Sequence, residues 1–117
     1  MSKGWIGVDL DGTLAHYDGW KGADHVGPPI PAMVERVQRW RAEGREVRIF
    51  TARVSCQPAE RTAVMAAIQN WSAEHIGEVL LVTNVKDFGM IELWDDRAVQ
   101  VVPNTGEPVG QSTRGLT

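Results

Sequence analysis

Two aspartates, Asp9 and Asp11, stand at the end of the apolar segment 5–10 and are the first residues of this chain suited to chemistry. Carboxylates at the end of a buried strand are costly unless a cation or another partner is present. Asp9 has the position of a nucleophile toward phosphorus that also binds a metal, and Asp11 that of a proton donor to the leaving oxygen. The backbone N–H groups of Gly12 and Thr13 are suited to bind a phosphoryl oxygen. The alternative is that residues 11–13 form a simple turn.

Three later segments with strand character are also followed by polar side chains. Thr51 comes after 47–50, Lys86 comes after 79–82, and Asp95 and Asp96 come after 91–94. Each has a simpler explanation when taken singly: Thr51 as the cap of a turn, Lys86 as a solvated lysine, and the acidic pair as part of a loop. Because ligands gather at the carboxyl ends of parallel strands, their joint occurrence favours one shared site.

Helical patterns separate the first three of these strands. One begins at Pro31 and ends at Gly44, and a second begins at Pro58 and ends at Gly77. A last short strand is expected at 99–102. This alternation predicts an α/β fold: a three-layer Rossmann-like sandwich with a mostly parallel sheet and helices on both faces. We expect one domain over 1–110 and a polar C-terminal tail over 111–117.

The motifs resemble those of the haloacid dehalogenase-like (HAD) phosphatases over residues 5–102. The segment DLDGTL, which begins at Asp9, is similar to the first signature of that superfamily, and IFTAR, which contains Thr51, is similar to the second. Lys86 resembles the third motif, and the acidic pair in LWDDR the fourth. The resemblance implies that the Thr51 hydroxyl binds the transferring phosphoryl group and that Lys86 holds the nucleophile and the phosphate together.

A magnesium site is expected from two independent arguments. Ligands that are all oxygen atoms suggest a hard divalent cation. The HAD resemblance implies Mg²⁺ close to Asp9, to the backbone carbonyl of Asp11, and to one or both of Asp95 and Asp96. The expected function is hydrolysis of a phosphate monoester through an aspartyl-phosphate on Asp9.

Two departures from the HAD pattern affect the expected site. Only seven residues, 84–90, join the third strand to the fourth, whereas a parallel crossover usually takes a dozen or more, so it is open whether Lys86 reaches the site. No loop is long enough for a cap domain, so the site is expected to be open. An open site suits a large substrate or a small one covered by a second copy of the chain.

Several residues near the motifs are candidates for substrate contacts. Arg53 and Arg97 hold either a distal phosphate or a neighbouring carboxylate. The loop after the first motif contains His16, Tyr17, Trp20, Lys21 and His25, which either contact substrate or are ordinary loop residues. Resemblance to capless HAD proteins, and of the DDR segment to polynucleotide kinase-phosphatases, favours a nucleotide or a nucleic-acid 3′ end as substrate.

Composition narrows the function classes. The net charge of −3 gives no global basic surface for nucleic acid, and the lone Cys56 fits a reducing compartment. With no expected signal peptide or membrane span, we expect a cytoplasmic protein.

The rival hypotheses for the function are a receiver-like phosphoacceptor domain and a catalytically idle HAD-like binding module. A receiver has an aspartate after its third strand and its lysine after its fifth, which is not the order here.

Overall fold

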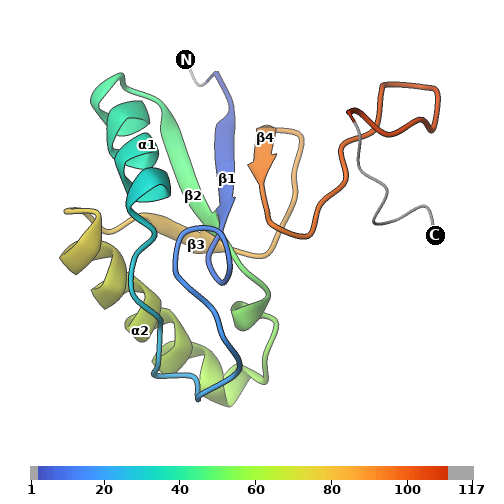
Figure 1. Cartoon of the computed structure of the whole chain (residues 1–117). Coiled ribbons are helices and arrows are strands. Elements are labelled where there is room, and N and C mark those ends of the chain that lie inside the picture. Colours follow the sequence, from blue (N-terminus) through green and yellow to red (C-terminus); the bar gives the residue numbers. More distant parts are fainter. Residues whose placement is uncertain (1–2, 111–117) are drawn as a thin grey trace.

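A computed structural model describes residues 3–110 (Figure 1); the predicted polar tail, 111–117, lies outside them. Four strands form one parallel sheet in the order β3-β2-β1-β4. They are β1 (Trp5–Asp9), β2 (Glu46–Phe50), β3 (Leu81–Thr83) and β4 (Met90–Trp94). This order matches that of the first four strands of a Rossmann fold. The predicted α/β class and parallel sheet are therefore confirmed.

Two α-helices connect the first three strands. They are α1 (Pro31–Ala42) and α2 (Pro58–His75), and a short 3₁₀ helix, η1 (Ala52–Val54), follows β2. Each α-helix begins with the proline that predicted it, because a proline in the first turn gives up no helical hydrogen bond. Both end within two residues of their predicted glycine stops. Their bounds therefore follow from the sequence.

The main core lies on one face of the sheet. Alternate residues of β1 and β2, namely Ile6, Val8, Val47 and Ile49, are buried in a single cluster with apolar residues of α1 and α2. Since both helices contribute to this one cluster, the predicted arrangement with helices on both faces is not confirmed by residues 3–110. The fold is a parallel sheet with its two helices packed in a common core.

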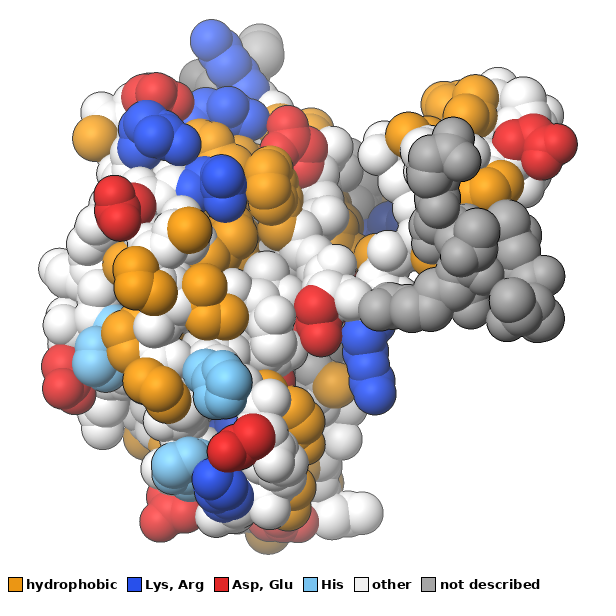
Figure 2. Space-filling view, in the orientation of Figure 1, with side chains coloured by type: hydrophobic (Ala, Val, Ile, Leu, Met, Phe, Trp, Pro, Cys, Tyr) orange, Lys and Arg blue, Asp and Glu red, His pale blue; other side chains and the backbone are white. Residues whose placement is uncertain are grey.

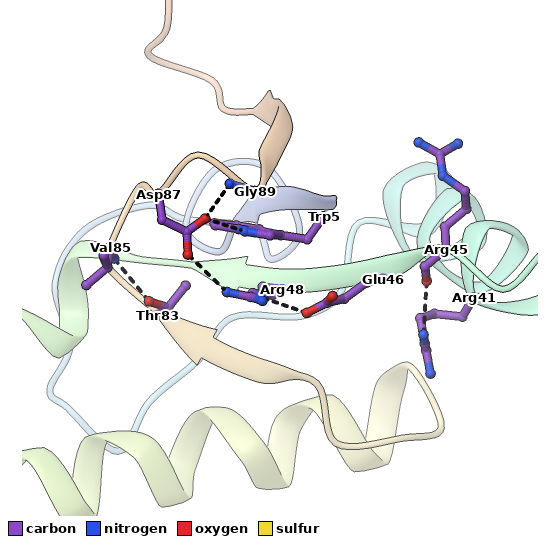
Figure 3. A network of polar contacts seen from close by, with 9 residues as sticks. All are labelled: Trp5, Arg41, Arg45, Glu46, Arg48, Thr83, Val85, Asp87 and Gly89. Atoms are coloured by element: carbon purple, nitrogen blue, oxygen red, sulfur yellow. Dashed lines mark hydrogen bonds and ion pairs between the residues drawn. The ribbon is translucent and has the colours of Figure 1, made fainter. Parts of the chain in front are cut away.

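The other face of the sheet is crossed by the connection from β3 to β4, residues 84–89 (Figure 3). Asp87 Oδ1 accepts hydrogen bonds from Trp5 Nε1 and from the backbone N–H of Gly89, both at 2.8 Å. The guanidinium of Arg48 stacks on Trp5, with 4.4 Å between its Cζ atom and the ring centroid. The short connection therefore needs no helix, because side chains of β1 and β2 hold it against the sheet.

The predicted strand at 99–102 does not form. Among residues 3–110, its pairing is limited to an isolated bridge between Val101 and Pro108. Figures 1 and 2 show this part of the chain projecting from the body, with hydrophobic side chains on its surface. The valine run has strand propensity but no neighbouring strand to pair with, so the prediction was wrong.

No helix in the described part of the chain is long and apolar enough to cross a membrane.

Candidate active site

Three strand ends meet where the strand connections change direction. The chain leaves β1 toward β2 and β3 on one side and returns to β4 on the other, so β1 and β4 are neighbours without being consecutive. Asp9 ends β1, Thr51 directly follows β2, and Asp95 directly follows β4. In open parallel sheets, ligands bind beyond the carboxyl ends of the strands at such a reversal. The topology therefore brings the predicted residues from distant segments to one place.

A cavity of about 780 Å³ lies at these strand ends. It is lined by seven of the predicted site residues: Asp9, Asp11, Thr51, Arg53, Asp95, Asp96 and Arg97. The aromatic side chains of Tyr17 and Trp20 from the loop after β1 also line it, and they are 46% and 59% exposed. The cavity is larger than a phosphate group alone requires, so its lining can also contact the rest of a substrate.

Asp9, Asp95 and Asp96 form a compact acidic group. One carboxylate oxygen from each lies within 4.8 Å of the others. Burial raises the pKa of Asp9 to about 7, and the neighbouring charges of Asp95, Asp96 and Asp11 act in the same direction. Three carboxylates supply only hard oxygen ligands, and a bound divalent cation would relieve their mutual repulsion. The residues present thus fit Mg²⁺.

The turn after β1 supports this group. The Thr13 hydroxyl lies 3.4 Å from Asp9 Oδ2 and accepts a hydrogen bond from the backbone N–H of Asp96 at 3.0 Å. The N–H of Gly12 donates to the carbonyl of Ala15 at 2.8 Å, and that of Thr13 to the carbonyl of Leu10 at 3.4 Å. Gly12 and Thr13 are therefore engaged in holding the turn and the acidic residues. Binding of a phosphoryl oxygen by their N–H groups stays a prediction.

Arg53 forms an ion pair with a neighbouring carboxylate, which is one of the two contacts expected from the sequence. Its Nε and Nη2 atoms each donate to a different oxygen of Asp11, both at 2.8 Å, and its side chain is only 6% exposed. Arg53 thus binds a neighbouring carboxylate in this structure, and its contact with a distal phosphate of the substrate stays a prediction. Asp11 belongs to this ion pair and is not part of the three-carboxylate group, so its metal contact through the backbone carbonyl stays a prediction.

Thr51 and Lys86 differ in placement. Thr51 is buried in the cavity wall, and its Oγ1 accepts the backbone N–H of Arg53 at 3.1 Å while its hydroxyl hydrogen can be donated elsewhere. Lys86 is exposed and is not among the residues that line the cavity. The physical reason is the short β3–β4 connection, which leads the chain away from the carboxyl ends of the strands. The phosphate-holding role of Lys86 stays a prediction without geometric support.

Two polar residues of the cavity lining, Asn84 and Ser55, were missed by the sequence analysis. Asn84 Nδ2 donates to Ser55 Oγ at 2.6 Å, and both residues line the cavity. Asn84 directly follows β3, so the same rule that indicated Thr51 and Asp95 would have indicated it. Ser55 lies in the loop after η1, where no sequence pattern marks it.

The comparisons with known proteins add support for the fold alone. No protein-family model matches the chain, and no curated protein matches it. The solved structure of a conserved protein from Bacteroides thetaiotaomicron is similar, with a TM-score of 0.58 and 20% sequence identity. The match covers 88% of this chain and 84% of that one.

Proposed function

We propose that this protein is an Mg²⁺-dependent phosphatase that hydrolyses a phosphate monoester through an aspartyl-phosphate on Asp9. The observation that carries the proposal is the meeting of Asp9, Asp95 and Asp96 in one cavity with Asp11 and Thr51. A hydroxyl, a metal-binding acidic group and a second carboxylate around one nucleophile are the parts that phosphoryl transfer by a carboxylate requires.

The chemical steps assign a role to each of these side chains. A carboxylate oxygen of Asp9 attacks phosphorus, the ester P–O bond breaks, and Asp11 gives a proton to the leaving oxygen. The Thr51 hydroxyl donates to a phosphoryl oxygen. Water then attacks the phosphorus of the aspartyl-phosphate while Asp11 takes a proton from it, which releases phosphate and restores Asp9.

Asp9, Asp95 and Asp96 would hold Mg²⁺. When bound, the cation neutralises charge on the phosphoryl oxygens and on the acidic group. Without that neutralisation, a phosphate dianion would be repelled by the carboxylates of the cavity. Ionised Asp9 is the nucleophilic form, so compensation of its charge also favours the reactive state.

The proposed substrate class is a nucleotide or a nucleic-acid 3′ end. Exposed Tyr17 and Trp20 at the cavity support it, because aromatic side chains stack on bases. Arg97 also lines the cavity and is exposed, so it can contact a phosphate of such a substrate. A second copy of the chain that covers the site, and a cytoplasmic location, remain predictions.

The topology disfavours the receiver-like alternative. Receiver domains have the strand order 2-1-3-4-5, in which the first strand lies between the second and the third. Here β1 lies between β2 and β4. The segment after β3 also begins with Asn84 and not with an aspartate that could accept a phosphoryl group.

The decisive experiment measures hydrolysis of p-nitrophenyl phosphate and of 3′-phosphorylated oligonucleotides with Mg²⁺ or with EDTA. Wild type is expected to be active only with Mg²⁺, and Asp9→Asn to lose at least about three orders of magnitude in kcat, because covalent chemistry is removed. Circular dichroism of the variant checks that the fold survives. More than a tenth of the wild-type rate in Asp9→Asn, or full activity without metal, would contradict the proposal. An idle binding module would be inactive on every ester.

A further inference from the structure

Arg53 joins two parts of the site that come from different segments. Besides its two hydrogen bonds to Asp11, its Nη1 atom donates to the backbone carbonyl of His25 at 2.8 Å. Its guanidinium carbon also lies 4.9 Å from the centroid of the Trp20 ring. His25 and Trp20 belong to the loop over residues 16–28, which we name the aromatic loop. One buried cation therefore touches both the aromatic loop and the expected proton donor.

The planar guanidinium of Arg53 limits how these contacts can change. The guanidinium is planar and its donors have fixed directions, so Arg53 cannot follow a movement of Trp20 or His25 without changing its contacts with Asp11. The bidentate pair also occupies both oxygens of Asp11. A proton donor needs one of them to face the leaving oxygen. The position of Arg53 thus determines what Asp11 can do.

The ends of the aromatic loop are fixed independently of Arg53. Ala15 and Pro29 form a bridge at its base, and the carbonyl of Gly27 accepts a hydrogen bond from Trp71 Nε1 at 2.9 Å. The section between these anchors carries exposed Tyr17 and Trp20 into the cavity. A movement caused by substrate would therefore be confined to the section that Arg53 contacts.

We propose that Arg53 is a positioning residue that couples the aromatic loop to Asp11. Substrate contact with Trp20 shifts the guanidinium and opens one of its two contacts with Asp11, so that one carboxylate oxygen turns toward the leaving group. The catalytic part of this inference rests on the proposed phosphatase function. The coupling between loop and carboxylate does not.

Limited trypsin digestion tests the coupling without any substrate. Lys21 lies in the aromatic loop with its side chain 51% exposed, so cleavage of the bond between Lys21 and Gly22 reports loop opening. Cleavage, followed by mass spectrometry, is expected to become at least about fivefold faster in Arg53→Lys and equally in Asp11→Asn, a factor typical of one weakened local interaction. Asp9→Asn, and Asp24→Asn within the same loop, should stay within about twofold of wild type. A wild-type cleavage rate in Asp11→Asn would overturn the proposal.

A double-mutant cycle tests the catalytic part. Trp20→Ala and Arg53→Lys are each expected to lower kcat for glycerol 3-phosphate by about tenfold or more, with a smaller change in KM and a smaller loss for p-nitrophenyl phosphate. If Trp20 acts through Arg53, the kcat of the double variant should equal that of Arg53→Lys alone, within about twofold. Arg39→Lys on α1 is the matched control and should be unaffected. Multiplicative losses would refute the coupling, whereas activity retained in Asp9→Asn would refute the proposed function and leave the trypsin result valid.

Discussion

Gly12 packs so closely against the carboxylate of Asp96 that a Cβ atom on residue 12 would lie 2.5 Å from Asp96 Oδ2. The φ angle of Gly12 is also +90°, which side chains other than that of glycine adopt with strain. Glycine at this position therefore serves two purposes: it forms the turn after β1 and it leaves room for one carboxylate of the acidic group.

The first prediction compares Gly12→Ala with Gly44→Ala. Both positions have positive φ, so both substitutions should lower stability by about 1–2 kcal/mol. A Cβ on Gly44 would meet nothing within 4 Å, whereas one on Gly12 displaces Asp96. We expect only Gly12→Ala to raise the Mg²⁺ concentration needed for half-maximal activity. Thermal unfolding and Mg²⁺ titrations check this; equal Mg²⁺ requirements in the two variants would count against the role of Asp96.

A second prediction concerns the metal directly. Asp95→Ala and Asp96→Ala should each raise the Mg²⁺ requirement, at least one of them by about tenfold or more, the smallest factor common for residues that support a metal site. Both carboxylates belong to the acidic group with Asp9. Glu35→Ala, which removes an exposed acid from α1, should leave the requirement unchanged. The measurement is half-maximal activation by Mg²⁺ after treatment with EDTA, and an unchanged value in both aspartate variants would exclude this site.

A third prediction follows from the pKa of Asp9. Because that pKa is raised from 3.8 to about 7 in the folded chain, the folded state binds the proton more tightly than the unfolded state does. The stability from protonated Asp9 is complete below pH 3.8 and is lost as the pH rises toward about 7. In a chelating buffer, the Tm of wild type should therefore fall relative to that of Asp9→Asn between pH 3.8 and about 7. Near pH 7, added Mg²⁺ should restore the Tm of wild type. A Tm difference that does not change with pH would contradict the raised pKa.

The sequence predicts those features that depend on local pattern. Pro31 and Pro58 predict the two helices because first-turn prolines are a local signal, and the ends of β1, β2 and β4 indicate Asp9, Thr51 and Asp95 because parallel strands share one carboxyl edge. The position of Lys86 depends on the path of a whole connection, and its motif carries no information about that path. The valines at 99–102 have strand propensity, but a strand needs a neighbour that only the tertiary fold supplies.

The partner of Arg53 likewise cannot be predicted from the local sequence pattern. Asp11 and Arg53 are 42 positions apart, and only the pairing of β1 with β2 places them side by side. The sequence indicates that each belongs to the site, and the fold decides that they bind each other. This contact affects how the role of Asp11 must be tested, since loss of the Asp11 charge also releases Arg53.

The last prediction separates acid catalysis by Asp11 from a purely positional role. Asp11→Asn should slow hydrolysis of an ester with a poor leaving group, such as glycerol 3-phosphate, far more than that of p-nitrophenyl phosphate, whose phenolate departs with little need of a proton. A loss of site geometry that does not act through the proton donor would instead slow both esters alike. Asparagine keeps the backbone carbonyl of residue 11 and has nearly the same shape as aspartate, so the fold should survive. The measurement is the ratio of kcat/KM for the two esters in wild type and variant. A ratio unchanged within about twofold would mean that Asp11 acts only through its position.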